Sequence, residues 1–341
     1  MDFYIDNENY NIWLRHNCKC NLCIHPMSKE LLTRPYKLTP AQLMIRKFTK
    51  DDFYYQIEWM DGHKSCFNLE DLLSDRNYSL ELHEFNRLFF LNYPSIDMLN
   101  EKKLVPIIAY DFSNVMKNIN EHGFCWLKNF GLDNSLLIKL LAENNFPLFE
   151  SHFGRYEDIQ PKEFNTTNSL MNDQLGYTYD EIDLHTDQPF LENPPPLQAL
   201  HCITKASTGG ENYITDGKLA WEILKNHNNK YAYLLSSVKI TFDRNQKNFK
   251  KKLDASIIES DKGEFISVRS SYFTLAPFNV PNNNEYYKAY NNYHYILDML
   301  KVKVELEEGD VLLYDNHRML HARGAFTGKR LMKGTYHIIG K

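Results

Sequence analysis

The tripeptide His185-Thr186-Asp187 and the stretch Asp315-Asn316-His317-Arg318-Met319-Leu320-His321-Ala322-Arg323 decide how this sequence is interpreted. Alternate residues of a strand share one face, so His185 and Asp187 can bind one metal ion from a single strand. A third ligand must come from far along the chain, and His321 is the candidate. Two histidines and one carboxylate make a facial triad with open positions, as non-haem Fe(II) oxygenases require.

Three alternatives to this interpretation stay open. His317 lies four residues before His321, so on a straight strand both would face the same way, and spacing does not choose between them. The same His/Asp/His set could hold zinc and activate water, which would make the protein a metal-dependent hydrolase. A non-enzymatic, zinc-anchored binding module is the third alternative.

Arg330 follows His321 and adds a second element to this pattern. A guanidinium binds a carboxylate through two parallel hydrogen bonds. A dicarboxylate cosubstrate that chelates the metal at one end would need such a partner at its other end. An arginine in a polar surface turn is the alternative, and Arg330 gains weight only together with the three metal-ligand candidates.

The sequence around these residues predicts an α+β protein that is mainly β. Many short apolar runs with turns between them are expected as strands, and this pattern is typical of a β-barrel or jelly roll braced by helices. The expected strands are 123–127, 197–203, 212–215, 238–241, 265–268, 311–314 and 335–339. The expected helices are 112–121, 134–145 and 283–300.

The first 85 residues differ from the rest of the chain. Cys18, Cys20 and Cys23 fall within six residues, and this spacing indicates a zinc site that needs a fourth ligand. His63 is the best candidate for that ligand, because it follows the Asp61-Gly62 turn of an expected hairpin over 54–59 and 63–69. The runners-up are His25 and then Cys66. Three ordinary thiols are the alternative.

Composition excludes several classes of protein. The chain has 341 residues, of which 43% are hydrophobic and 24% charged, so it is not expected to be disordered. A net charge of −5 does not favour binding to nucleic acid or to an anionic membrane. We see no apolar run long enough for a membrane helix and no signal peptide, so a cytoplasmic protein is expected.

Motifs along nearly the whole chain carry a family resemblance. In order, they are Trp13-Leu14-Arg15-His16-Asn17-Cys18-x-Cys20-x-x-Cys23, Trp59-x-Asp61-x-His63, Phe153-Gly154-Arg155, Tyr177-Thr178, His185-Thr186-Asp187, Leu200-His201-Cys202, Thr208-Gly209-Gly210, Asp216-Gly217, Asp315-Asn316-x-Arg318-x-Leu320-His321-x-Arg323 and Arg330-x-x-x-Gly334-x-Tyr336. The sequence resembles the γ-butyrobetaine and trimethyllysine hydroxylases, which are Fe(II)- and 2-oxoglutarate-dependent oxygenases of the TauD/TfdA type.

The resemblance implies a domain organisation and two metal sites. A small zinc-binding β domain would occupy residues 1–85, and a double-stranded β-helix would occupy residues 86–341. Iron would be bound by His185, Asp187 and His321, which decides for His321 over His317. Zinc would be bound by Cys18, Cys20, Cys23 and His63.

The resemblance also implies roles in substrate binding and assembly. Arg330 would bind the distal carboxylate of 2-oxoglutarate, and Asn212 would assist in binding this cosubstrate. Tyr177 and Tyr336 match two tyrosines of an aromatic cage for a quaternary ammonium, and Gln188 is a further candidate for substrate contact. A homodimer is expected by analogy.

The expected function follows from these roles. The protein is predicted to use dioxygen and 2-oxoglutarate to hydroxylate an unactivated C–H of a small amine or betaine, giving succinate and carbon dioxide.

Overall fold

The computed structural model describes residues 8–26, 28–68, 93–95, 99, 102, 104–151, 154–162, 174–246, 249–278 and 283–339. Phe153 of the motifs lies outside the described residues, as does the end of the hairpin segment expected over 63–69.

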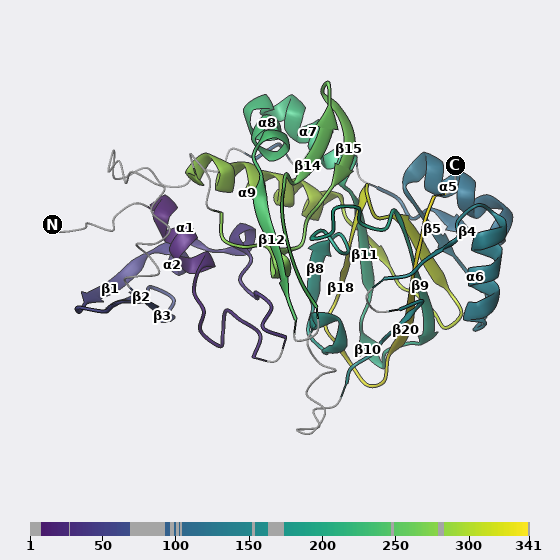
Figure 1. The fold of residues 1–341 in the computed structure, drawn as a ribbon, viewed down its shortest axis with the longest axis horizontal. Coiled ribbons are helices and arrows are strands. Elements are labelled where there is room, and N and C mark those ends of the chain that lie inside the picture. The colour runs from purple at the N-terminus through teal and green to yellow at the C-terminus, as the bar shows by residue number, and fades with distance from the viewer. Residues whose placement is uncertain are drawn as a thin grey trace.

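A small β-sheet forms the N-terminal unit at the left of Figure 1. Its antiparallel order β1-β2-β3 confirms the expected hairpin between β2 and β3. The residues just before the first strand form a helical turn that begins with a Thr39–Gln42 capping box. The elements are α1 (Glu8–His16), η1 (Pro35–Lys37), α2 (Pro40–Leu43), β1 (Ile45–Lys50), β2 (Tyr54–Trp59) and β3 (Lys64–Asn68).

Two larger sheets build the jelly roll that the strand pattern predicts. The first has the order β16-β11-β18-β8, with β16 (Val302–Val304), β11 (Asn212–Asp216), β18 (Met319–Arg323) and β8 (Ile182–His185). The second has the order β4-β5-β17-β9-β20-β6, and β7 also pairs with β20. Its strands are β4 (Ile108–Ala109), β5 (Phe124–Leu127), β17 (Val311–Asp315), β9 (Leu197–Thr204), β20 (Leu331–His337), β6 (Leu148–Phe149) and β7 (Glu157–Ile159). Apolar side chains from both sheets, including Leu200, Ile214 and Leu312, share one buried cluster.

Helices cover the outer faces of these sheets. α5 (Val115–His122), after the short η2 (Phe112–Asn114), and α6 (Asn134–Glu143) pack on the seven-stranded sheet through Val115, Leu137 and Leu141. Both helices confirm the sequence prediction, and Figure 1 shows them at the end of the molecule opposite the N-terminal unit.

Three further helices pack together, with α7 and α8 at the top of Figure 1 and α9 beneath them, between the N-terminal unit and the jelly roll. α9 (Asn283–Leu300) has the bounds that the sequence predicts, whereas α7 (Gly217–His227) and α8 (Asn229–Ser237) were not expected. α9 packs against both α7 and α8 and also contacts α1. Four of its tyrosines, Tyr286, Tyr287, Tyr290 and Tyr293, are fully buried, and Tyr287 hydrogen-bonds His16 of α1 at 2.9 Å. The helix therefore joins the N-terminal unit to the rest of the core.

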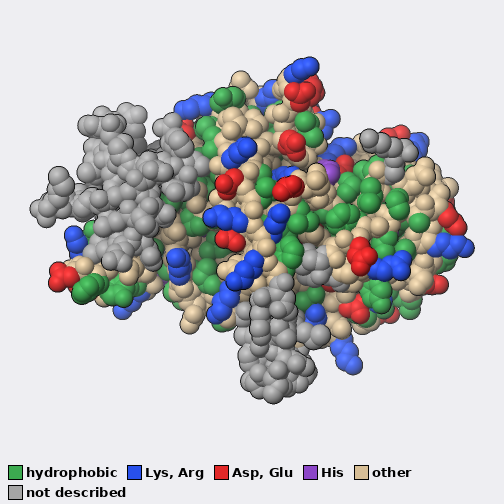
Figure 2. Space-filling model, in the orientation of Figure 1, with side chains coloured by type: hydrophobic (Ala, Val, Ile, Leu, Met, Phe, Trp, Pro, Cys, Tyr) green, Lys and Arg blue, Asp and Glu red, His purple; other side chains and the backbone are tan. Residues whose placement is uncertain are grey.

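Short elements complete the chain. Two hairpins project beside the helices, formed by β12 (Ile240–Asn245) with β13 (Lys250–Ala255) and by β14 (Ile258–Asp261) with β15 (Glu264–Val268). The remaining elements are η3 (Leu175–Tyr177), η4 (Tyr272–Thr274), β10 (Thr208–Gly209) and β19 (Phe326–Thr327). Acidic and basic side chains are interspersed over the face shown in Figure 2. Every helix in the described ranges is too short or too polar to cross a membrane.

Asp216 connects α7 to the four-stranded sheet. Its carboxylate accepts from the Leu219 backbone as the N-cap of α7 and pairs with Arg318 at 2.5 Å. Because the carboxylate is buried, we expect Asp216→Ala to cost about 3 kcal/mol of unfolding free energy, from the lost cap and the unpaired arginine. Asp133→Ala, which removes only the exposed cap of α6, should cost about 1 kcal/mol. Urea unfolding measures both, and equal losses would contradict the role of the ion pair.

Candidate active site and metal centres

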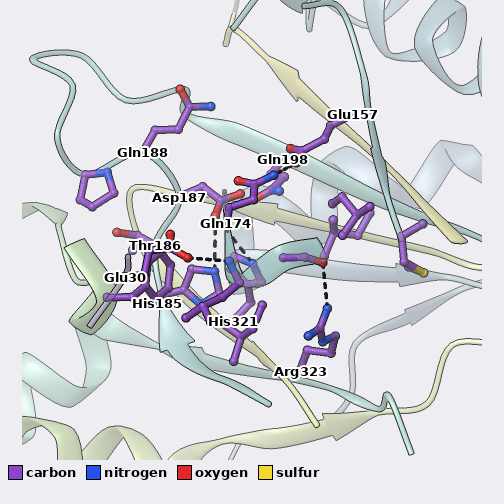
Figure 3. A pocket seen from close by; sticks show the side chains of 18 of the residues that line it. Glu30, Glu157, Gln174, His185, Thr186, Asp187, Gln188, Gln198, His321 and Arg323 are labelled. Carbon is purple, nitrogen blue, oxygen red and sulfur yellow. Dashed lines mark hydrogen bonds and ion pairs between the residues drawn. The ribbon is translucent and has the colours of Figure 1, made fainter. Parts of the chain in front are cut away.

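His185, Asp187 and His321 converge at one end of the four-stranded sheet (Figure 3). β8 and β18 are antiparallel neighbours, and His321 lies directly opposite His185 in their register. Asp187 Oδ1 lies 3.5 Å from His185 Nε2 and 4.0 Å from His321 Nε2. One ligand atom from each residue falls within 4.8 Å of the others, which is a spacing that one metal ion can bridge.

The pair His185 and Asp187 converges by a different geometry from the one the sequence suggests. β8 ends at His185, so Asp187 does not share a strand face with it. The Thr186 backbone N–H instead donates to the Ser270 carbonyl at 2.6 Å, which turns the chain. The turn after the strand, and not the alternation of a strand, brings Asp187 back to the histidine.

The structure separates His317 from His321. His317 lies in the turn that precedes β18, and its Nε2 lies 2.9 Å from the Pro194 carbonyl oxygen. The expectation that both histidines would share one face assumed a straight strand, which the turn at 315–318 removes.

The protonation states at this cluster suit a metal ion. His185 Nδ1 lies 2.8 Å from the Asp183 carbonyl oxygen, so it donates there and leaves Nε2 for a metal. Burial lowers the pKa of His321 to about 3. Burial acts to raise the pKa of Asp187, but its contacts with His185, His321 and the Tyr336 hydroxyl outweigh burial and hold that pKa below its usual range. A neutral imidazole and an ionised carboxylate are the forms that bind metals.

Arg330 lies in the wall of the cavity that contains these three residues. Its side chain is 6% exposed, and its Nη2 donates to Asn212 Oδ1 at 3.5 Å. Burial lowers the pKa of Arg330 to about 10, so it remains a cation at neutral pH. Within the described ranges no carboxylate pairs with this guanidinium. A buried cation that faces a neutral amide is a site prepared for an anionic ligand.

The three predicted substrate residues occupy different positions. Gln188 and Tyr336 line the cavity, and the Tyr336 hydroxyl donates to Asp187 Oδ2 at 2.8 Å. Tyr177 is buried but does not belong to the cavity lining described. The Lys162 ammonium lies 3.1 Å from the centre of the Tyr177 ring.

Sequence reasoning missed a group of buried polar residues in the same cavity. Glu30 pairs with Arg244, Arg244 Nη2 donates to Gln174 Oε1 at 3.2 Å, and Gln174 Nε2 donates to Glu157 Oε1 at 2.5 Å. The four side chains come from four separate segments, so no local motif could indicate them. Figure 3 labels Glu30, Gln174 and Glu157 around the three converging residues.

The second cluster lies in the N-terminal unit. His63 Nε2 is 3.4, 3.6 and 3.7 Å from the sulfur atoms of Cys18, Cys20 and Cys23, respectively. The hydrogen bond from Cys23 lowers the pKa of Cys18 to about 4, which favours a thiolate. Of the other candidates for a fourth ligand, His25 faces Asp180 and Cys66 is exposed. Three sulfurs and one imidazole nitrogen form a donor set that fits tetrahedral zinc.

Comparison with known proteins identifies the family. The model of the taurine catabolism dioxygenase TauD, TfdA family matches residues 103–336, and the model of the γ-butyrobetaine hydroxylase-like N-terminal domain matches residues 6–73. The chain therefore belongs to the TauD, TfdA family, and it is a dioxygenase. The resemblance inferred from the motifs is confirmed.

Curated relatives match along most of the chain. The γ-butyrobetaine dioxygenase of Pseudomonas sp. (strain AK-1) is 27% identical over 96% of this chain and 86% of its own length. The human γ-butyrobetaine dioxygenase is 27% identical over 95% of this chain and 87% of its own. The trimethyllysine dioxygenase of Meyerozyma guilliermondii is 25% identical over 96% and 86%.

Solved structures share the fold of this chain. An asparagine oxygenase in complex with Fe(II), hydroxyasparagine and succinate superposes with a TM-score of 0.53 at 14% identity, covering 67% of this chain and 78% of that one. The non-heme iron oxygenase OrfP, in complex with Fe, succinate and a hydroxyarginine, gives a TM-score of 0.51 at 16% identity, covering 67% and 80%. These likenesses confirm the jelly-roll expectation.

Asn316 is a positioning residue for Asp187. Its Oδ1 accepts from the Asp187 backbone N–H at 2.8 Å, and its Nδ2 donates to the Asp187 carbonyl at 3.0 Å. Because such supporting contacts orient a ligand, we expect Asn316→Ala to weaken Mn(II) binding by about 10- to 100-fold. His317→Ala alters the same turn without touching Asp187 and should bind Mn(II) nearly as the parent does. Calorimetric titration of folded protein measures both variants, and equal weakening would contradict a specific role for Asn316.

Proposed function

We propose that this protein is an Fe(II)- and 2-oxoglutarate-dependent dioxygenase that hydroxylates an unactivated C–H of a small cationic or zwitterionic metabolite, of the type represented by γ-butyrobetaine and trimethyllysine. One observation carries the proposal. A facial set of two histidines and one carboxylate shares a cavity with a buried arginine that has a neutral partner. That combination fits a metal ion and a dicarboxylate ligand together.

Each residue of this set has a definite task in the proposal. His185, Asp187 and His321 would hold the iron. Bound iron, 2-oxoglutarate and dioxygen together supply the oxidising chemistry that yields succinate, carbon dioxide and a hydroxylated product. Arg330 would bind the far carboxylate of 2-oxoglutarate, and Asn212 would orient the guanidinium through the hydrogen bond between them. This clamp fixes the cosubstrate relative to the metal.

Other residues of the cavity would align and isolate the reacting groups. Tyr336 fixes one Asp187 oxygen through its hydroxyl and leaves the other for the metal. Gln188 and Tyr336 would contact the substrate from the lining. Tyr177 would act indirectly, because its hydroxyl bonds to Glu157. The apolar lining residues, such as Phe190 and Phe273, exclude water from the cavity.

The N-terminal unit completes the proposal. Cys18, Cys20, Cys23 and His63 would hold a structural zinc ion, because four protein ligands leave no position for a substrate. Residues 1–85 would form this zinc-binding domain, and residues 86–341 the oxygenase domain. The homodimeric state and the cytoplasmic location expected above belong to the same proposal.

The two alternative functions find no support. The relatives found in the comparisons are named dioxygenases, and the match to a dioxygenase family argues against a hydrolase. A non-enzymatic binding module would not require Asp187. Unchanged function in Asp187→Ala would therefore support that alternative and contradict the proposed iron site.

The arginine clamp gives a direct test of the proposed function. Arg330→Ala should raise the KM for 2-oxoglutarate by at least about 30-fold, because losing one partner of a buried charge pair costs 2–5 kcal/mol. Lys205→Ala removes an exposed cation that pairs with Glu307 and should leave this KM unchanged. Succinate formation with iron and ascorbate measures both. An unchanged KM in Arg330→Ala would overturn the assignment of the cosubstrate site.

The cysteine cluster gives an independent prediction. Elemental analysis of protein purified without chelator should find about one zinc per chain, since a closed thiolate site retains its metal. Cys20→Ser should lose most of this zinc and lower the melting temperature, whereas Cys66→Ser, with an exposed thiol, should keep both. Parent protein that is folded but free of zinc would contradict the zinc site.

A further inference from the structure

Glu157 is a carboxylate in the cavity wall that forms no ion pair with any residue in the described part of the chain. It lies on β7, it is buried, and it lines the same cavity as the metal-ligand candidates. Its hydrogen bonds come from neutral groups, namely the Gln174 amide at 2.5 Å and the Tyr177 hydroxyl. Lys162 is a described cation whose charge acts on this carboxylate, and the two do not form an ion pair.

The other carboxylates in the described lining of the cavity have partners. Glu30 pairs with the buried Arg244, and Asp187 belongs to the cluster with two histidines. Glu157 therefore remains as the carboxylate that a ligand could neutralise. Burial raises its pKa to about 7, which shows the cost of keeping this charge out of water without a cation. A bound cation would remove that cost.

Glu157 is held in place by a chain of buried hydrogen bonds. Gln174 donates to Glu157 and accepts from Arg244, while Glu30 receives the Arg244 ion pair and also accepts from the Leu175 backbone N–H at 2.5 Å. Every member of the chain is buried. The carboxylate is thus fixed before a ligand binds, which favours selective recognition.

Tyr177 does not offer an open ring face for a trimethylammonium. Such a group has no N–H and binds to the faces of aromatic rings. The ring of Tyr177 already carries the Lys162 ammonium, and the residue is not among the described lining of the cavity. A primary ammonium or a guanidinium, by contrast, can donate charged hydrogen bonds to a carboxylate.

We propose that Glu157 binds a cationic substrate group that carries N–H donors, a primary ammonium or a guanidinium, and that it selects this group over a trimethylammonium. The proposal rests on the proposed function for the identity of the reaction. It keeps the class of small cationic metabolites, but it replaces the trimethylammonium of γ-butyrobetaine and trimethyllysine with a group that carries N–H donors. Glu157 is then the counterpart of Arg330: one charge binds the substrate and the other binds the cosubstrate.

Matched pairs of ligands test this selectivity. We would measure binding to the full-length protein by calorimetry for L-lysine against Nε-trimethyl-L-lysine, and for 4-aminobutyrate against γ-butyrobetaine, with L-arginine as the guanidinium probe. At least one N–H cation should bind, and a primary amine should bind at least about 10-fold more tightly than its trimethylated partner. The absence of binding by every N–H cation, or tighter binding of the trimethylated partners, would overturn the proposal.

Two variants assign the preference to Glu157. Glu157→Gln keeps the size of the side chain and should abolish the preference, with weaker binding of the N–H cation. Asp158→Asn alters the next residue of β7, whose half-exposed carboxylate pairs with Lys333, and should keep the preference. Circular dichroism and the melting temperature confirm that both are folded. A preference that persists in Glu157→Gln would refute the role of this residue.

Turnover separates this proposal from the proposed function. Binding is measured without added iron or 2-oxoglutarate, so it does not depend on catalysis. If 2-oxoglutarate is consumed but the trimethylated compounds are the better ligands, the proposed function stands and the role of Glu157 fails. If the N–H preference is found and depends on Glu157, but the iron-loaded protein never forms succinate, the proposed function fails and the binding role stands.

Discussion

The pairing of β8 with β18 is the constraint on which the site depends. It places His185 opposite His321, so the two imidazoles lie side by side although the chain between them is long. Asp187 joins them only because the chain turns after β8. In this turn the Thr186 backbone N–H donates to the Ser270 carbonyl, and the Asp187 backbone N–H donates to the Asn316 side chain. The Tyr336 hydroxyl donates to the buried carboxylate at 2.8 Å and stabilises it. Sheet register and turn geometry together therefore determine how the three metal-ligand candidates are arranged.

The cavity is organised by two opposite charges that lie buried among polar groups. Arg330 carries a positive charge beside the Asn212 amide, and Glu157 carries a carboxyl group between an amide and a phenol. Burying a charge without a counter-charge is costly, so natural proteins keep such groups where a ligand completes them. The metal-ligand candidates belong to the same cavity. This arrangement suits a reaction that needs two ligands oriented around one metal ion.

Some of this architecture could be predicted from sequence, because its signals are local. The apolar run at 311–314 and the periodicity of 283–300 depend on neighbouring residues, and the structure has β17 and α9 there. The ordered motifs also predicted the family and identified His185, Asp187 and His321 as candidates.

Other features could not be predicted, because they depend on the tertiary structure. The turn at 315–318 separates His317 from His321, and no spacing rule indicates it. The contacts that join Glu30, Arg244, Gln174 and Glu157 link four distant segments. The sequence motif suggested that the ring face of Tyr177 is free to bind a cationic substrate group. In the folded chain the Lys162 ammonium lies over that ring.

Glu30 gives the N-terminal unit a direct part in shaping the cavity. This residue follows the cysteine cluster by only a few positions, yet its carboxylate meets Arg244 from the β12 hairpin and the backbone of Leu175. The two units of the chain are thus not interchangeable modules. A chimera that combined the oxygenase unit with the N-terminal unit of a relative would also replace part of the cavity wall. Its substrate selectivity would change unless a carboxylate were retained at the position of Glu30. Evolution of new substrate preferences in such proteins can therefore act at a distance from the jelly roll.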